Sequence, residues 1–391
     1  MPGDDGADAA STPVPGTVSS GTRLAPLDGM RAAFLAVVMC HHLVWAAPGS
    51  AANLVEGAWS ALDGFFVLSG FLIGGLLFSE RARTGTIRYG RFMLRRILRL
   101  YPAMLVAVAA MVVVSLLVDH RAWHDLWPTV RSSVLYLENR QFGRHDIALF
   151  DAHGPGPVPE YSHLWSLALE FQFYLVLPLV LLALFALRTG PKVWAAVLAA
   201  IMAVVWWNRT RVWAGQPFPA AYVFTETRVD TLLWGVLLAL AFREGWLGER
   251  HRRIVRILVV PALAWTAWVV WKYAPLTSFV YDWAMTISGL TSSILLAYVL
   301  LDGGSLLARF LGSGPMRWLG ARSYSIYLYH FPVFFFVGRH LGSVAPGLRI
   351  PLAIALAIGL ADASYRLVER PGFKLKDRIG RRPAPAPAAT A

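Results

Sequence analysis

The sequence contains little charge and only one cysteine. Charged side chains make up 15% of the 391 residues, whereas 57% are hydrophobic. A soluble domain of this length carries more charge and less apolar sequence, so the composition excludes an ordinary soluble protein. The single cysteine, Cys40, excludes an intramolecular disulfide, and the sequence shows no metal-binding motif and no internal repeat.

Apolar stretches long enough to cross a bilayer recur along the chain. They predict an all-α fold, a polytopic membrane helix bundle of about ten transmembrane helices. The third, fifth, seventh and eighth stretches carry essentially no ionisable residue, so we expect them to form the lipid-facing wall. The ten stretches lie at 28–48, 58–79, 100–118, 163–187, 191–207, 222–242, 254–274, 282–301, 322–338 and 349–367.

Both ends of the chain have the composition of tails. Residues 1–23 are rich in small and polar residues, which predicts a disordered N-terminal tail, and they lack the features of a signal peptide. Residues 373–391 form a basic, Pro/Ala-rich segment that we expect to be a cytoplasmic tail. The transmembrane domain is therefore predicted to span residues 24–372.

Basic residues outnumber acidic ones by 36 to 23, and they gather at the ends of apolar stretches. Clusters at 81–99, 243–256 and 370–382 fall on one side of a ten-span bundle. The positive-inside rule makes that side cytoplasmic, with both termini inside. This distribution indicates topology signals and lipid anchors and argues against nucleic-acid binding.

The longest connection on the other side is 119–162. Its sequence HDLWPTVRSSVLYLE predicts an interfacial helix, and the segment HGPGPVPE follows. A connection of this length in a compact protein is typical of a lid, a binding element or disorder.

The first apolar stretch carries Arg31 near one end and His42 eleven residues later. In a helix this spacing separates the two residues by about 16 Å along the axis and about 20° around it, so they share one face. The side chain of His41 points about 80° away from that of Arg31, so we expect His41 to have a structural role. Ionisable residues inside a membrane normally mark a functional site, and others at depth are Asp63, Glu170, Arg228, Asp230, His330 and Asp362.

His42 and Glu170 are predicted to lie at the same depth. Counted from the cytoplasmic end of the first stretch, His42 lies about 10 Å below the opposite surface. The fourth stretch enters from that surface near His163, and Glu170 follows seven residues later, also about 10 Å deep. A carboxylate beside an imidazole raises its basicity, which favours His42 as a general base.

Several motifs together resemble the integral-membrane acyltransferase 3 family. They occur in the order of the family and cover residues 24–372. The resemblance implies transfer of an acyl group from cytoplasmic acyl-CoA, often acetyl-CoA, to a hydroxyl that is commonly on a sugar. The motifs are LDGMR…HH, DGFFVLSGFLI at 63–73, RFMLRRILRLYP at 91–102, HLWSLALEFQFYL at 163–175, RVDTLLWG at 228–235, SYSIYLYHFP at 323–332 and ERP at 369–371.

The same resemblance implies a multi-pass protein of the bacterial plasma membrane. Its acceptor would be a cell-envelope glycan or the sugar of a natural product such as a macrolide. Some members of the family carry a fused esterase-like domain, which we do not expect in this chain. Acyl-CoA would be a co-substrate, and we expect no permanently bound cofactor and no metal.

Residue roles follow from the two arguments together. His42 is the predicted catalytic base, and Glu170 would orient or assist it. Arg31 would bind the phosphates of coenzyme A together with Arg95, Arg96 and Arg99. Further candidates for the substrate cavity are Ser69, Arg228, Asp230, Tyr327 and His330.

Structural interpretations stand beside these roles. Arg31 could extend to the interface, His42 could be a buried histidine bonded to a carbonyl, and Arg228 and Asp230 could form an ion pair between helices. A proton-coupled transporter of a sugar or an acylated compound is an alternative function, because proton relays also use intramembrane His, Glu, Asp and Arg. The absence of paired Gly/Pro-interrupted segments argues against it. A non-catalytic scaffold would not require His42 and Glu170 at one depth.

Overall fold

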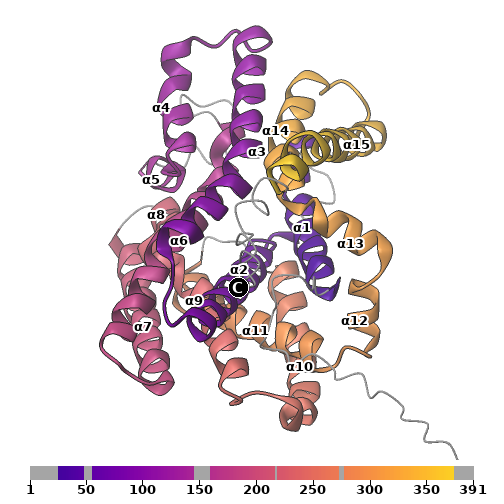
Figure 1. Ribbon diagram of the computed structural model, residues 1–391. Helices are drawn as coiled ribbons and strands as arrows, with labels where there is room; N and C mark the ends of the chain where they lie inside the picture. The colour runs from indigo at the N-terminus through magenta and orange to yellow at the C-terminus, as the bar shows by residue number, and fades with distance from the viewer. Residues whose placement is uncertain (1–24, 48–54, 145–158, 216–217, 273–276, 374–391) are drawn as a thin grey trace, which may run out of the picture.

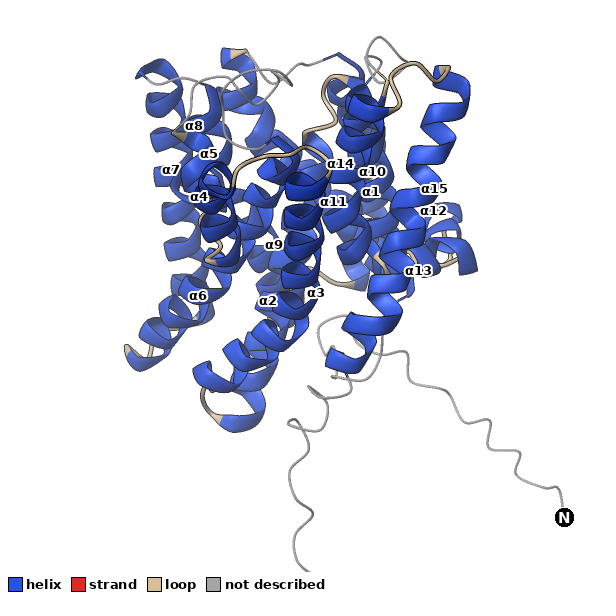
Figure 2. Cartoon of the chain, turned by 90° about the horizontal axis from the view of Figure 1, so that it is seen from above, coloured by secondary structure: helices blue, strands red, loops and turns tan. Residues whose placement is uncertain are grey.

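A computed structural model describes residues 25–47, 55–144, 159–215, 218–272 and 277–373. Within these ranges every regular element is a helix, and the long helices run side by side in one bundle (Figure 1, Figure 2). The expected all-α membrane bundle is thereby confirmed. The predicted tail of residues 1–23 lies outside the described residues, and so does the tail of residues 373–391 except for Phe373, which is helical.

The first half of the chain contains seven α-helices and a short 3₁₀ helix among the described residues. They are α1 (Ala25–Ala46), α2 (Ser60–Thr84), α3 (Tyr89–Leu117), α4 (Trp123–Val134), α5 (Glu138–Gly143), η2 (Pro159–Leu164), α6 (Trp165–Ala186) and α7 (Pro191–Gly215).

The second half continues the bundle and ends in a π-helical turn. Its elements are α8 (Phe218–Val223), α9 (Thr225–Arg243), η3 (Glu249–His251), α10 (Arg252–Lys272), η4 (Val280–Ala284), α11 (Met285–Leu301), α12 (Leu306–Leu311), α13 (Gly314–Ala321), α14 (Ser323–His340), α15 (Pro346–Ser364) and η5 (Tyr365–Glu369).

Eight helices within the described ranges are long and apolar enough to cross a membrane, fewer than the expected ten. The two stretches that do not qualify form α9 and α14, which are helical and packed within the bundle. The physical reason is their polarity. Charged residues lie in the first and last turns of α9, and α14 is rich in Tyr, Ser and His. Neither helix therefore contains an uninterrupted apolar segment long enough to qualify.

Helices α2 and α9 form the most extensive helix pair of the bundle. A Cβ atom on Gly70 of α2 would lie 1.9 Å from the carbonyl oxygen of Leu232, and one on Gly235 of α9 would lie 1.9 Å from that of Val67. Only glycine fits at both positions, because the two backbones touch. Small residues at such crossings are the usual means of close packing between membrane helices.

Helix α1 has similar backbone contacts at both ends. Near its start, a Cβ atom on Gly29 would lie 1.9 Å from the carbonyl oxygen of Leu311, and one on Gly320 would lie 1.8 Å from that of Asp28. Near its end, a Cβ atom on Gly338 of α14 would lie 1.8 Å from the carbonyl oxygen of Trp45. The helix that carries Arg31 and His42 is therefore fixed by α12, α13 and α14.

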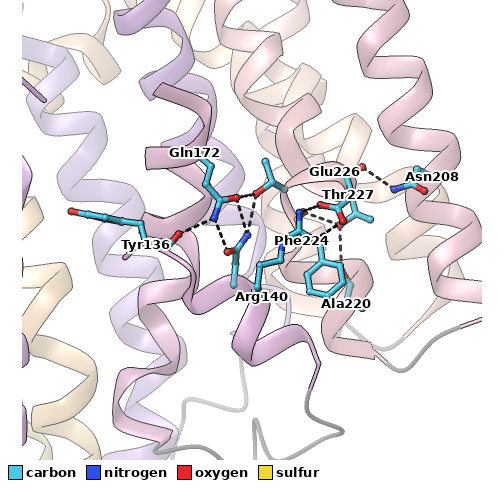
Figure 3. A network of polar contacts seen from close by, with 10 residues as sticks. Tyr136, Arg140, Gln172, Asn208, Ala220, Phe224, Glu226 and Thr227 are labelled. Carbon is cyan, nitrogen blue, oxygen red and sulfur yellow. Dashed lines mark hydrogen bonds and ion pairs between the residues drawn. The ribbon is translucent and has the colours of Figure 1, made fainter. Parts of the chain in front are cut away.

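The helix predicted in the 119–162 connection is confirmed as α4, which is followed by the short α5, and its interfacial position stays a prediction. Side chains tie this hairpin to the bundle (Figure 3). Gln172 of α6 donates to the carbonyl oxygen of Tyr136 at 2.8 Å, and Arg140 forms a bidentate ion pair with Glu226 of α9. The connection is thus a docked element over 123–144. The HGPGPVPE segment, apart from its last two residues, lies outside the described residues.

Candidate functional site

A pair of histidines joins α1 to α14. Nδ1 of His42 lies 2.9 Å from Nε2 of His330. Nδ1 of His330 lies 3.0 Å from the carbonyl oxygen of Ile326 and 2.8 Å from that of Tyr327. Carbonyl oxygens only accept hydrogen bonds, so in neutral His330 the proton is on Nδ1 and Nε2 is an acceptor. His42 then donates from Nδ1, which leaves a lone pair on its own Nε2.

Aromatic side chains enclose this pair. The ring of Phe331 lies edge-on to His42 with centroids 4.8 Å apart, and it stacks on His163 at 5.2 Å. His163 in turn lies edge-on to His330 at 5.8 Å, and its Nε2 is 3.2 Å from the carbonyl oxygen of Leu328. His330 is fully buried. The rings pack against both histidines, and His42 is only partly exposed.

A row of polar side chains, called the polar column below, runs from the histidine pair along one face of α6. Its members are spaced by three or four residues, which places them on successive turns. Ser166 lies 2.6 Å from the Tyr327 hydroxyl, and Tyr174 lies 2.9 Å from the Ser69 hydroxyl. From His163 to Tyr174 the column extends about 16 Å, the same length as the step from His42 to Arg31. Its members are His163 at the end of η2, followed by Ser166, Glu170 and Tyr174 of α6.

Three arginines gather at the far end of this column. Arg31 forms an ion pair with Asp28 at 3.2 Å, and its charge interacts with those of Arg99 and Glu170. Arg96 interacts with the same two residues and with Arg31, and its guanidinium lies 5.4 Å from the centre of the Tyr174 ring. Like charges this close create a positive potential that suits a polyanion.

Arg95 is the exception among the arginines expected to bind coenzyme A. Arg95 lies on a different face of α3 from Arg96, because adjacent residues of a helix point about 100° apart. Its Nε is buried and has no hydrogen-bond partner among the described residues. The structure brings Arg31, Arg96 and Arg99 together and does not connect Arg95 to them through any described contact.

Glu170 lies at the middle of the column. Its charge interacts with the arginine group and with Tyr174, Tyr324 and Tyr327. The hydrogen-bond partner of the His42 ring nitrogen, however, is His330 and not Glu170. The structure therefore places a histidine where the sequence suggested Glu170, and whether Glu170 assists His42 stays a prediction.

The other predicted cavity residues on α9 form a separate buried charge cluster. Arg228 pairs with Asp63 of α2 at 2.9 Å, and Asp230 pairs with Arg209 of α7 at 2.9 Å. All four side chains are at most 2% exposed. The ion pair suggested between Arg228 and Asp230 is thus not the observed pairing, because each finds its partner on a neighbouring helix.

Arg209 was missed by the sequence analysis. The fifth apolar stretch was ended at residue 207, whereas α7 continues to Gly215. The predicted bound was therefore too early, and it left out Arg209, which is fully buried and donates to Asp230, Thr286 and two carbonyl oxygens. Among the described residues no group of His, Cys, Asp and Glu is arranged to hold a metal ion.

Fold and site together define a polytopic membrane protein with a hydrogen-bonded histidine pair at one end of a polar column and arginines at the other. The family model for the acyltransferase domain matches residues 24–366. The chain therefore belongs to the acyltransferase 3 family, as the motifs indicated, and is a multi-pass membrane protein.

Two curated relatives illustrate the similarity. The peptidoglycan O-acetyltransferase OatA of Listeria monocytogenes is 29% identical over 357 residues, which cover 88% of this chain and 55% of that protein. The O-acetyltransferase OatA of Staphylococcus aureus is 29% identical over 368 residues, covering 89% of this chain and 57% of that protein. The chain thus spans little more than half the length of these relatives. No solved structure matches it.

Proposed function

We propose that the protein transfers an acetyl or other short acyl group from acyl-CoA to a hydroxyl of a cell-envelope glycan. The observation that carries this proposal is the His42–His330 pair, which directs an unprotonated Nε2 of His42 away from its partner. Membership of the acyltransferase family and the peptidoglycan activity in the name of the Listeria relative support the choice of reaction and acceptor.

The coenzyme would bind at the arginine end of the column. Arg31, Arg96 and Arg99 supply fixed cationic groups for its phosphates, a role that guanidinium groups perform well. An extended pantetheine arm has a length similar to the separation of about 16 Å between Arg31 and His42. The thioester would then reach the histidine pair while the nucleotide stays at the arginines.

The reaction needs one proton to move twice. His42 Nε2 removes the proton from the acceptor hydroxyl, whose oxygen attacks the thioester carbonyl carbon. The C–S bond then breaks, and the imidazolium returns the proton to the departing thiolate, so an ester and free coenzyme A result. His330 keeps the Nδ1–H of His42 in a hydrogen bond throughout, which orients the base and stabilises its charged form.

The topology follows the positive-inside rule. We propose that α9 and α14 cross the membrane with the eight apolar helices, because both pack inside the bundle. This gives ten spans with both chain ends in the cytoplasm, where acyl-CoA is found. The arginine group would then face the cytoplasm and the histidine pair would lie near the opposite surface, on the side of the glycan.

The test is acceptor-dependent release of thiol from acetyl-CoA by the purified protein. Peptidoglycan fragments and a glycosylated macrolide are supplied in parallel, and His42→Ala is compared with His41→Ala as a matched control on the neighbouring residue. We expect release with peptidoglycan fragments that His42→Ala abolishes and His41→Ala retains. Release with the macrolide alone would favour a natural-product acceptor. If neither acceptor leads to thiol release, the search would turn to other hydroxyl compounds.

Transport is the second class of function, because the buried ionisable groups would also suit a proton relay. Reconstituted vesicles loaded with a labelled sugar separate the two. Proton-driven efflux without thiol release would contradict the acyl transfer proposed here.

A further inference from the structure

A cavity of about 490 Å³ opens between α10, the end of α11 and α12. None of the residues that line it belongs to the histidine pair, the polar column or the arginine group described above. Arg252 and Arg256 lie at one end of the cavity and are one helical turn apart, and Val259 and Leu263 continue the same face of α10. The lining of the cavity therefore changes from cationic to apolar along a single helix face.

Asp302 holds the two arginines in place. Nη2 of Arg252 lies 2.7 Å from Oδ1 of Asp302, and Arg256 reaches both carboxylate oxygens, with Nε 2.7 Å from Oδ2 and Nη2 3.0 Å from Oδ1. The side chain of Asp302 is only 6% exposed, whereas those of Arg252 and Arg256 are 41% and 52% exposed. The carboxylate contacts the guanidinium groups from the inner side and leaves their outer edges open.

Charge at the cavity favours an anion. Hydrogen bonds from Arg256 and Arg252 lower the pKa of Asp302 to about 2, so the carboxylate is ionised at neutral pH. One carboxylate against two guanidinium groups leaves one positive charge at the cavity, and at the same end of α10 Arg250 and Arg253 outnumber Glu249. No described hydrogen bond uses Nη1 of Arg252 or Arg256, so both can donate to a ligand.

The apolar part of the cavity lies on an exposed side of a membrane-length helix, so we expect it to face the bilayer. The side of α10 beyond the arginines exposes Leu263 by 45%. Since Arg252 begins a membrane-length helix, the arginines lie at headgroup level and the apolar residues lie at the level of the acyl chains. This order of charge and apolar surface matches a glycerophospholipid.

We propose that this cavity is a binding site for an anionic glycerophospholipid. The headgroup phosphate accepts hydrogen bonds from the outer edges of Arg252 and Arg256, and an acyl chain lies along Val259 and Leu263. Basic pockets between membrane helices bind anionic headgroups in this way, and guanidinium groups match phosphate geometry. A zwitterionic lipid is disfavoured because Asp302, the one acidic residue lining the cavity, is already bonded to both arginines.

The experiment measures lipids retained by the full chain in native mass spectrometry after titration with phosphatidylglycerol or phosphatidylcholine. The variant is Arg252→Gln/Arg256→Gln/Asp302→Asn, in which no buried carboxylate is left unpaired. The matched control is Arg250→Gln/Arg253→Gln, which removes two charges from the same end of the helix without touching the cavity. Inorganic phosphate is added as a competitor in a separate arm.

We expect wild type and the control to retain phosphatidylglycerol over phosphatidylcholine, and the triple variant to bind phosphatidylglycerol at least tenfold more weakly. Equal retention by wild type and the triple variant, or no preference between the two lipids, would overturn the proposal. Displacement of the lipid by millimolar inorganic phosphate would assign the site to a free anion and would also overturn it. The readout is binding, so it does not depend on acyl transfer.

Discussion

His42 and His330 are 288 positions apart in the sequence, and their ring nitrogens lie 2.9 Å apart in the bundle. The hydrogen bond has a defined direction, because two backbone carbonyls fix the proton of His330 on Nδ1. A histidine that is oriented in this way presents one basic nitrogen to a substrate, which is what general-base catalysis requires.

Removing either member of the pair should reduce turnover, but to different extents. We expect His42→Ala to lower kcat by 10³-fold or more and His330→Ala to lower it by about 10²-fold, since the latter leaves the base present but not oriented. The KM for acyl-CoA should change little in His330→Ala. Steady-state kinetics check this, with His41→Ala as the control. A His330→Ala variant with unchanged kcat would show that the pair is structural.

The arginine group should determine coenzyme affinity. Arg96→Gln is expected to raise the KM for acyl-CoA by about tenfold or more, because a hydrogen bond to a charged group contributes roughly 1.5–3 kcal/mol. The effect should shrink as salt is added. Arg88→Gln, at the exposed start of the same helix, is the control and should behave like wild type. If both variants change KM equally, the effect is one of general surface charge.

The Asp63–Arg228 pair should be sensitive to loss of one partner. Asp63→Ala leaves a buried guanidinium without its ion pair, which costs roughly 3–5 kcal/mol. The double variant Asp63→Leu/Arg228→Met removes both charges and should recover most of the stability. Apparent melting temperature in detergent measures both. The half-exposed pair Arg140 and Glu226 provides a contrast, and its removal should cost under about 1 kcal/mol.

Glu138, in the docked hairpin between α3 and α6, should make stability depend on pH. Burial raises its pKa to about 8, and hydrogen bonds from Ser132 and Ser133 only partly oppose the shift. The folded state therefore holds a proton that the unfolded chain loses near the ordinary value of 4.5. Stability should fall as pH rises from about 4.5 to 8 and then level off.

The measurement for Glu138 is the apparent melting temperature between pH 5 and 9. Glu138→Gln keeps the shape of the neutral acid and cannot ionise, so it should reduce the slope. A slope identical to that of wild type would mean that another group causes the pH dependence.

Hydropathy predicted most of the bundle, and helical spacing predicted the site in part. The eleven-residue step from Arg31 to His42 placed them on one face of α1, and the seven-residue step from His163 of η2 to Glu170 of α6 is a segment of the observed column. These are local relationships, which a single helix determines.

Partners between helices could not be predicted in the same way. His330 was a candidate, yet nothing in the sequence identified it as the partner of His42, because the pairing depends on how α14 packs against α1. The partners of Asp63 and Arg209 could not be predicted for the same reason, because both partners lie on another helix, α9. A charged residue just beyond an apolar stretch, such as Arg209, is a signal that the helix continues.

The glycine contacts of α1 with α12, α13 and α14 prevent that helix from sliding or rotating without a backbone collision. Helix geometry sets the separation of Arg31 and His42, and the glycine contacts fix the position of both residues relative to the neighbouring helices. If acyl-CoA is the donor, as proposed, its thioester reaches His42 only when the arm between its phosphates and its sulfur matches that separation. Selection of the donor would then rest on the fixed position of α1 and not on a pocket that recognises the acyl group.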